Sequence, residues 1–540
     1  MNKGYFAMAH ELVAPELFRP PLDLPSMPYD HLLRLAAERA PECPAIIFHN
    51  QRLTYREVVS MVNSLANGLR NLGVGPGERI CLFTPNRPEY TITLNAASTI
   101  GAVVTPMNPS YKEREIAYQL ADSEACAILV YRDLVPLLRS VLQQTPLPQL
   151  KHIIITGINE AVPDEMPGAR SFAQLLRESS PRRPDPVQIN VNDLFALPYS
   201  SGTTGLPKGV MLSHRNLVSN HLQFVTAGGI SSSDVTLIFL PMYHIYGVLL
   251  TGTFLAVGAT QVLLERFDPM RVLELCEQYG VTWFFAVPPV ILALANMSDL
   301  SKLKTVRYVM NAAAPLPLDL ARKLYERTGI TIVQAYGLTE SSPDTHLSPT
   351  DPSLMRLESV GLPVSNTEQK IMDIETGTRE LQPGEDGEVV VRGPQVMQGY
   401  WKSPEETARV LRDGWLYTGD IGHLDADGWL FVVDRKKEMI KYKAFSVAPA
   451  ELEALLLEHS AVLDAAVIGV PDDEAGEVPK GFVVLRPGQQ ATAEELIIFV
   501  NGKLAGYKKL RYLEFIDAIP KVPSGKILRR ELKERERANR

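Results

Sequence analysis

The chain has 540 residues, of which 45% are hydrophobic and 21% are charged, and 54 basic against 62 acidic residues give a net charge of −8. This length exceeds what one hydrophobic core supports and predicts about two to four compact units. The acidic balance argues against nucleic acid as a general partner, and the composition is that of an ordinary soluble globular protein. Four widely spaced cysteines, Cys43, Cys81, Cys126 and Cys276, are expected to be buried, reduced thiols.

Two features of the chain bear on its location. The first residues lack the continuous apolar core of a signal peptide and the last residues carry no peroxisomal signal, so the cytoplasm is the expected compartment. Residues 245–264 contain no charged residue, over a length that could span a bilayer. Their glycines and the turn at Val257–Ala259 instead predict a buried helix followed by the strand Thr260–Leu264.

From about residue 50 onward, helical and extended patterns alternate. Thr54 and Glu57 form a capping signal for a helix that stops at Gly73, and the strand Ile80–Phe83 follows. The same cycle recurs three times, with these expected helices and strands: Glu113–Leu120 and Ala125–Val130, Pro269–Tyr279 and Val281–Ala286, and Leu318–Thr328 and Thr331–Ala335. The alternation predicts an α/β fold of layered, mainly parallel sheets, which bind ligands in loops beyond the carboxyl ends of their strands.

The last third of the chain differs in texture. After Val364, short strands and turn signals predict a β-rich subdomain over residues 364–433. A dense charge run begins at Asp434, and the hundred or so residues beyond it have the size of a small, mobile α+β domain. We therefore expect an N-terminal domain over residues 1–433, a hinge over 434–437 and a C-terminal lid over 438–540.

The stretch Tyr199–Gly209 is rich in glycine and hydroxyl groups and follows the expected strand Asp193–Pro198. Its glycines let backbone N–H groups turn toward an anion, its hydroxyls are donors, and its lysine is a cation; these residues are Gly202, Gly205, Gly209, Ser200, Ser201, Thr203, Thr204 and Lys208. It is not a Walker loop, because Lys208 follows Pro207 and precedes Gly209. We interpret it as a phosphate-binding loop; the alternative is a flexible linker.

Four further polar clusters follow along the chain. Gln334–Glu340 offers an aromatic face at Tyr336, a hydroxyl at Thr339, and at Glu340 a carboxylate suited to Mg²⁺. Taken alone, each cluster has a plain alternative, a solvated loop acid or an exposed basic face. The other three clusters are Gly414–Asp420, Asp434–Lys437 with Lys441 and Lys443, and Pro520–Lys526.

In this order, the clusters resemble the motifs of the adenylate-forming enzymes, a superfamily that includes acyl-CoA synthetases, 4-coumarate:CoA ligases and firefly luciferases. The resemblance covers nearly the whole chain and is closest to the aryl- and fatty-acyl-CoA ligases. The matching segments are Ser200–Gly209, Pro241–Gly247, Tyr336–Glu340, Tyr417–Asp420, Asp434–Lys437, Val447–Glu453 and Pro523–Lys526.

The resemblance implies a two-step reaction. A carboxylate attacks the α-phosphate of ATP and releases pyrophosphate, and the acyl-adenylate then reacts with the thiol of CoA. It implies these catalytic residues: Lys526, Thr339, Glu340, Lys441 and His244. It implies ATP contacts at Ser200, Ser201, Gly202, Thr203, Thr204, Gly205, Lys208, Ala314, Gln334, Ala335, Tyr336, Gly337, Thr339, Asp420, Arg435, Lys437 and Lys526.

The resemblance also implies the other ligand sites and a movement of the lid. Acyl contacts fall at His244, Tyr246, Asn311, Ala312 and Ala335, CoA contacts at Arg266, Lys443 and Ala444, and Mg²⁺ contacts at Glu340 and Thr203. The lid would rotate about Lys437 and replace the Lys526 loop by the segment around Lys441. Arg266 has the plain alternative of a surface arginine. The oligomeric state, monomer or homodimer, stays open.

Alanine replaces the usual glycine of the family at three positions. Ala312 and Ala335 would narrow the acyl pocket, which favours a slim acid, either a medium-chain fatty acid or a simple aryl acid. Ala444 stands where the family's glycine faces the pantetheine tunnel, which keeps an amine or another non-CoA acceptor open as an alternative. A third hypothesis, a catalytically dead nucleotide-binding protein, is opposed by the intact Lys526, Glu340 and Asp420.

Overall fold

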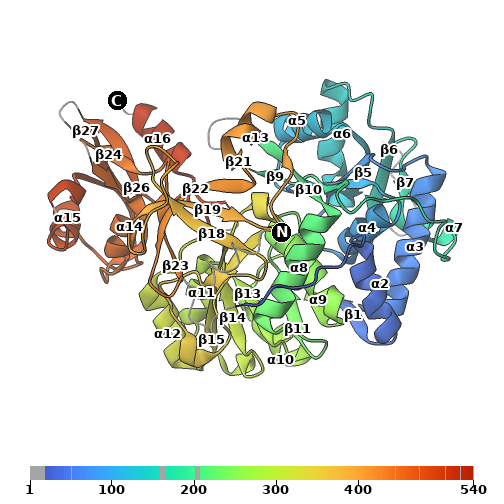
Figure 1. Ribbon diagram of the computed structural model, residues 1–540, viewed down its shortest axis with the longest axis horizontal. Coiled ribbons are helices and arrows are strands. Elements are labelled where there is room, and N and C mark those ends of the chain that lie inside the picture. The colour runs from blue at the N-terminus through green and yellow to red at the C-terminus, as the bar shows by residue number, and fades with distance from the viewer. Residues whose placement is uncertain are drawn as a thin grey trace.

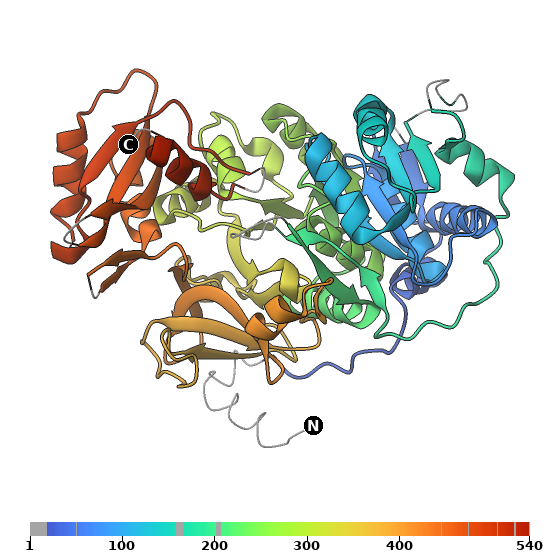
Figure 2. The same ribbon diagram turned by 90° about the horizontal axis from the view of Figure 1, so that it is seen from above.

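The computed structural model describes residues 19–49, 51–157, 162, 166–200, 207–443, 445–472, 475–504, 506–522 and 525–538, and for 445 and 446 only the backbone. Four sheets organise these residues, and Figure 2 shows the unit at the C-terminal end (red) at one end of the molecule, opposite the earliest helices (blue). The α/β fold expected from the alternating patterns is confirmed.

The first sheet has nine strands in the order β17-β16-β15-β14-β13-β11-β12-β1-β2. Its central pairs, from β1–β12 to β14–β15, are parallel, and its two edges are antiparallel. The strands are β1 Pro44–Phe48, β2 Gln51–Thr54, β11 Val235–Ile238, β12 Thr260–Leu263, β13 Trp283–Ala286, β14 Tyr308–Asn311, β15 Thr331–Gly337, β16 Asp344–Leu347 and β17 Leu362–Pro363.

The second sheet follows the order β20-β10-β8-β4-β3-β5-β6-β7, with β9 paired to β10. It is parallel from β8 to β7 and antiparallel around β10. The strands are β3 Arg79–Phe83, β4 Val103–Pro106, β5 Ala125–Tyr131, β6 His152–Thr156, β7 Arg170–Ser171, β8 Leu194–Ala196, β9 Tyr199–Ser200, β10 Lys208–Ser213 and β20 Gly399–Tyr400.

Two smaller sheets follow, and both are mainly antiparallel. The third contains β18 Glu368–Met372, β19 Gly387–Arg392, β21 Leu411–Arg412, β22 Trp415–Leu424 and β23 Leu430–Arg435. The fourth contains β24 Ile440–Tyr442, β25 Phe445–Val447, β26 Val462–Asp472, β27 Gly476–Leu485 and β28 Tyr512–Phe515.

Helices pack against the sheets, and Figure 1 labels them. They are α2 Asp30–Arg39, α3 Tyr55–Asn71, α4 Pro88–Thr99, α5 Glu113–Ser123, α6 Val135–Gln144, α7 Phe172–Glu178, α8 His214–Gly228, α9 Ile245–Val257, α10 Pro269–Tyr279, α11 Pro288–Ala295, α12 Leu318–Thr328, α13 Pro404–Val410, α14 Pro449–Leu457, α15 Ala493–Asn501 and α16 Arg529–Ala538. The expected capping box is confirmed: Thr54 accepts from Glu57 N, and Glu57 accepts from Thr54 N.

Helix α8 connects the two large sheets. It contacts β8 and β10 of the second sheet, β16 of the first, and α9. The neighbouring α9 is buried along almost its whole length, which explains the uncharged run in the sequence. Among the described residues, no helix combines the length and apolarity needed to cross a membrane.

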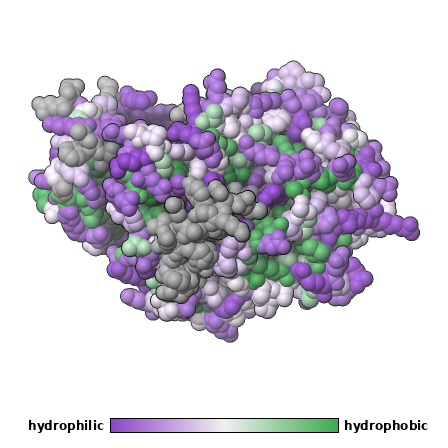
Figure 3. Space-filling model, in the orientation of Figure 1, coloured by the Kyte–Doolittle hydropathy of each residue, from purple (hydrophilic) through white to green (hydrophobic). Residues whose placement is uncertain are grey.

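The surface and the cysteines complete the description. Charged and polar side chains cover most of the face shown in Figure 3. All four cysteines are free, and Cys81, Cys126 and Cys276 are buried. Cys43 is exposed, so the expectation that all four are buried was wrong. It lies in the turn between α2 and β1, outside any apolar segment that would carry it into the core.

Candidate active site

The phosphate-binding loop has described residues only at its two ends. Ser201, Gly202, Thr203, Thr204 and Gly205 lie outside the described residues. At the start of the loop, the Ser200 hydroxyl donates to Glu340 Oε1 at 3.2 Å. At its end, Lys208 Nζ lies 2.6 Å from Glu406 Oε2 and 5.5 Å from the ring centre of Tyr400. The start of the loop is thus in contact with the acid predicted to bind Mg²⁺.

Glu340 follows β15 in the short 3-10 helix Thr339–Ser341. A side chain at Gly337 would overlap the carbonyl of Pro343, so glycine is required at this turn. The Glu340 carbonyl accepts from Met397 N at 2.9 Å, and its carboxylate accepts from Tyr400 OH at 2.9 Å. The sequence-based prediction does not include Tyr400. This residue is sixty positions away from Glu340 in the chain, and no local sequence pattern indicates that the two are in contact.

Asp420 and Arg435 form an ion pair across neighbouring strands, in which the carboxylate is buried and the guanidinium is partly exposed. They are register partners on β22 and β23, and Arg435 Nε lies 2.9 Å from Asp420 Oδ1. Tyr336 OH donates to the other carboxylate oxygen at 2.7 Å. The negative charge of Asp420 raises the pKa of Arg435, and burial together with that charge raises the pKa of Tyr336. The sequence-predicted nucleotide residues of three different segments therefore meet at one carboxylate.

Lys526 reaches this cluster from the C-terminal end of the chain. Its loop is closed by a hydrogen bond from Val522 N to Lys526 O, and Pro523 and Ser524 lie outside the described residues. Gly525 has φ +84°, and a Cβ there would sit 2.9 Å from Pro289 Cδ at the start of α11. Burial and the charge of Arg435 lower the pKa of Lys526.

Three acids also act on Lys526, and Lys526 in turn acts on a second lysine. Asp420, Glu340 and Glu438 partly oppose the lowering of the Lys526 pKa, as expected of nearby carboxylates. Burial, Arg435 and Lys526 lower the pKa of Lys437 to about 8. Arg435, Lys437 and Lys526 thus lie within reach of one another's charges, together with three acids, and such cations can offset the charge of a polyphosphate.

The residues assigned to CoA lie differently. Lys441 and Lys443 are exposed on and just after β24, where their backbone N–H groups donate to Glu477 Oε2 and Ala475 O. Arg266 is exposed. Ala444 lies outside the described residues. In this conformation Lys441 is exposed, whereas Lys526 is half-buried and lies within the electrostatic influence of Arg435, Asp420 and Glu340.

The predicted acyl residues surround the start of α9 and the ends of β14 and β15. His244 caps α9 by accepting from Tyr246 N at 3.3 Å, and burial and the charge of Lys526 lower its pKa to about 4. Ala312 and Ala335 are buried, 9% and 6% exposed. Asn311 donates to Gln334 Oε1 at 2.9 Å and to Ala314 O at 3.1 Å. Tyr246 is buried, and its hydroxyl has no hydrogen-bond partner in the described part of the chain.

The donor set fits Mg²⁺ bound chiefly through substrate. Within the described ranges, no group of three or more His, Cys, Asp or Glu could enclose a metal. Glu340 offers one carboxylate oxygen to two hydroxyl donors. Mg²⁺ commonly takes one or two protein carboxylates and completes its shell with water and substrate phosphates. A single acid beside the phosphate loop meets that requirement.

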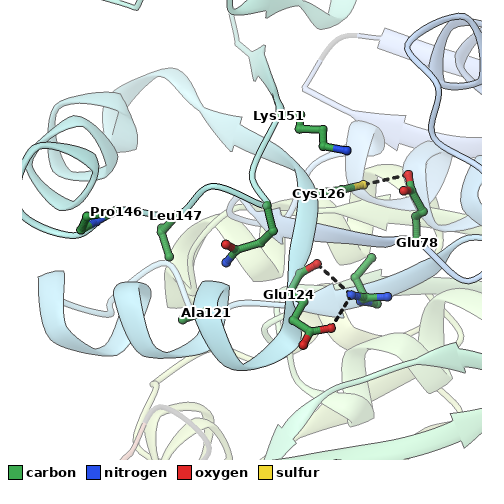
Figure 4. A pocket seen from close by; sticks show the side chains of 9 residues that line it. Glu78, Ala121, Glu124, Cys126, Pro146, Leu147 and Lys151 are labelled. Carbon is green, nitrogen blue, oxygen red and sulfur yellow. Dashed lines mark hydrogen bonds and ion pairs between the residues drawn. The ribbon is translucent and has the colours of Figure 1, made fainter.

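A separate cavity of about 510 Å³ lies at the amino ends of β3, β5 and β6 (Figure 4). Cys126 Sγ lies 3.3 Å from Glu78 Oε2, and burial and that acid raise the pKa of the thiol to about 12. The thiol is therefore protonated at neutral pH and is a poor nucleophile. Glu124, which also lines the cavity, binds Arg79 at 2.8 Å.

Comparisons with known proteins agree with this geometry. The model of the AMP-binding enzyme family matches residues 33–401, and the model of its C-terminal domain matches 451–526. The chain is 39% identical over 515 residues to 4-coumarate–CoA ligase 5 of Oryza sativa subsp. japonica, covering 93% of this chain and 92% of the relative.

Solved structures give the same result. A crystal structure of an anthranilate CoA ligase with anthranoyl-AMP is 29% identical with a TM-score of 0.86, covering 95% of this chain and 98% of that one. ATP-bound MatB from Rhodopseudomonas palustris is 28% identical with a TM-score of 0.86, covering 94% and 99%. The chain therefore belongs to the AMP-binding enzyme family, and it is an acid–thiol ligase of the adenylate-forming superfamily.

Proposed function

We propose that the protein joins a slim aryl acid to CoA through an acyl-adenylate. The observation that carries the proposal is the placement of Lys526, from the C-terminal end, half-buried and within the electrostatic influence of Arg435, Asp420 and Glu340. The reaction uses ATP, Mg²⁺ and CoA. The acid attacks the α-phosphorus and pyrophosphate leaves; the CoA thiol then attacks the acyl carbon, loses its proton and releases AMP.

The first step brings an anionic nucleophile toward an anionic phosphate, and cations must offset this repulsion. We assign that role to Lys526, which would bridge the acid and the α-phosphate. Thr339 would donate to the same phosphate, and Asp420 with Arg435 would hold the ribose. Glu340 would hold Mg²⁺, which neutralises the polyphosphate when bound. These assignments rest on the Asp420–Arg435 ion pair, on the half-buried position of Lys526 and on the family motifs.

The second step requires a different lysine segment at the same site. We propose a hinge at Lys437, in the turn between β23 and β24, so that the unit after it can rotate. The segment around Lys441 would then replace the Lys526 loop. The exposed positions of Lys441 and Lys443 support this order of events, since the two segments would otherwise compete for one space. We further propose the cytoplasm as compartment, on the features of the sequence.

The substrate proposal rests on two buried methyl groups. Ala312 and Ala335 occupy space that glycine would leave open. The 4-coumarate–CoA ligase relative and the anthranilate ligase favour an aryl acid over a fatty acid. We therefore propose an unsubstituted or lightly substituted aryl acid, with a medium-chain fatty acid as the second candidate.

Acid-dependent pyrophosphate release over a panel of acids tests this proposal. We expect benzoate, cinnamate and 4-coumarate to exceed sinapate, whose two methoxy groups need the space that the methyl groups fill. The double variant Ala312→Gly/Ala335→Gly should raise kcat/KM for sinapate about tenfold, the usual value of a methylene-sized change in a pocket. If wild type prefers sinapate, the narrow-pocket proposal is wrong; a preference for octanoate would favour the second candidate.

The adenylation rate should depend on pH through Lys526. Its pKa is lowered by burial and by Arg435, so its charge is lost at a lower pH than the ordinary lysine value of about 10.4. We expect the single-turnover rate to fall as the pH rises, with a midpoint below that value. His244, with a pKa of about 4, stays neutral and should add no inflection near pH 6.5. A rate that stays constant up to pH 10.5 would contradict the assignment.

A further inference from the structure

The phosphate loop is anchored at both ends to the same helix. Tyr199, the first residue of the loop segment, donates through its hydroxyl to Asp122 Oδ2 at 2.6 Å. Pro207, at the other end, accepts through its carbonyl from Tyr118 OH at 2.9 Å. Tyr118 and Asp122 are one turn apart on α5, so they face the same side of the helix. The rings of Tyr118 and Tyr199 also meet edge to face, 6.3 Å between centres.

A second element joins the same anchor. After β20, Trp401 Nε1 and Lys402 Nζ both donate to the carbonyl of Asp122, at 2.9 and 2.8 Å. This carbonyl is among the last four of α5, which have no partner within the helix, and a cation is favourable at a helix C-terminus. Lys402 also lies 3.0 Å from Glu124 Oε1, beside the cavity of Figure 4.

The segment at Trp401 reaches the loop as well. Trp401 N donates to Gly209 O at 2.8 Å, so it fixes the start of β10 just after the loop. Its neighbour Tyr400 donates to Glu340. Asp122 is thus bonded through its side chain to one end of the loop, and through its carbonyl to the segment that holds the other end and touches Glu340.

We propose that Tyr118 and Asp122 are positioning residues for binding of the ATP polyphosphate. We call the two residues, with Trp401 and Lys402, the loop brace. The proposal rests on the function proposed above and on the interpretation of Tyr199–Gly209 as a phosphate-binding loop, which would contact the β- and γ-phosphates of ATP. Hydrogen bonds that already fix Tyr199 and Pro207 in the unliganded protein reduce the cost of ordering this segment for binding. The Asp122 acceptor raises the pKa of Tyr199, together with burial, so its hydroxyl stays a donor.

The brace should matter for ATP and not for AMP, because AMP lacks the β- and γ-phosphates. Calorimetric titration of the full-length protein with MgATP and with AMP, without acid or CoA, gives both affinities. We expect Asp122→Ala to weaken MgATP binding about tenfold and AMP binding less than twofold. Asp122→Asn keeps an oxygen that accepts from Tyr199, so it should recover most of the loss.

Matched variants separate positioning from general destabilisation. Asp133→Asn removes an exposed carboxylate from the same region, one paired with Arg132, and should change neither affinity. Tyr118→Phe removes only the bond to Pro207 and should weaken MgATP about threefold to fivefold. Tyr131→Phe, in β5, is its control. If Asp122→Ala does not fold, the comparison of Tyr118→Phe with its control Tyr131→Phe tests the brace instead.

The results that would overturn the brace are distinct from those that would overturn the function. The brace is contradicted if Asp122→Ala weakens the binding of MgATP and of AMP equally, or if it binds MgATP with wild-type affinity. If Asp122→Ala does not fold, the same two results in Tyr118→Phe contradict the brace. A wild-type protein that binds no MgATP contradicts the proposed function together with the brace. If wild type and Asp122→Ala bind MgATP with the same affinity, the brace is contradicted but the proposed function is not.

Discussion

Replacement of Lys526 by alanine should reduce the rate of acyl-adenylate formation by at least about 100-fold, the effect typical of losing one preorganised charge-stabilising group. Lys526 is half-buried within the electrostatic influence of Arg435, Asp420 and Glu340, where the acid and the α-phosphate are proposed to meet. Thioester formation from supplied acyl-adenylate should stay within a few-fold of wild type, because another lysine segment serves that step. Rapid-quench measurements of pyrophosphate and acyl-CoA follow the two steps separately.

A surface lysine of the same unit provides the control. Lys503 pairs with Glu458 at the surface, and Lys503→Ala should leave both rates unchanged. Equal loss of both steps in Lys526→Ala would refute the division of labour between the two lysine segments. Unimpaired adenylation would refute the role of Lys526 altogether.

Replacement of Asp420 by asparagine should raise the KM for ATP by about 100-fold, which corresponds to about 2.7 kcal/mol. Asp420 is 3% exposed and accepts from Tyr336 and Arg435, so the variant leaves a partly exposed guanidinium without its counter-charge and a buried carboxylate site without its negative charge. It also replaces one of the two carboxylate oxygens proposed to accept from the ribose hydroxyls by an amide group that can only donate. Steady-state kinetics with ATP and with 3′-deoxy-ATP measure both effects.

The two nucleotides separate a ribose contact from a loss of structure. Wild type should discriminate against 3′-deoxy-ATP, whereas Asp420→Asn should discriminate much less. Asp425→Asn removes another arginine-paired carboxylate of the same sheet region and should keep the wild-type discrimination. Undiminished discrimination in Asp420→Asn would show that this carboxylate does not read the ribose.

Much of the fold follows from local sequence signals. The bounds of α10 and α12 match the predicted segments Pro269–Tyr279 and Leu318–Thr328, because an N-terminal proline or a C-terminal glycine marks their ends. The ends of strands follow less directly from the sequence. The predicted strand Thr331–Ala335 is shorter than β15, which continues two residues further to Gly337. Its extension depends on pairing with β16, and pairing between strands leaves no signal within one of them.

Only those residues of the candidate site that belong to sequence motifs could be predicted. The sequence supplied Asp420, Arg435 and Lys526 through their resemblance to a family, and the structure brings all three together. It did not supply Tyr400, Glu406, Tyr118 or Asp122. These residues act by touching a motif from a distant part of the chain: Asp122 is 77 residues from Tyr199, and Glu406 is 198 from Lys208. Neither the hydrophobic periodicity nor the spacing of motif residues in a short stretch of sequence indicates contacts between residues so far apart.

The most direct test of the account is a mass measurement of the products formed by the purified wild-type protein from ATP, Mg²⁺ and cinnamate or 4-coumarate, with and without CoA. We predict acid-dependent pyrophosphate in both cases, enzyme-bound acyl-adenylate without CoA, and free acyl-CoA with AMP when CoA is present. Absence of acid-dependent pyrophosphate over the whole acid panel would contradict the proposed reaction. Acyl-adenylate that persists in the presence of CoA would contradict CoA as the acceptor.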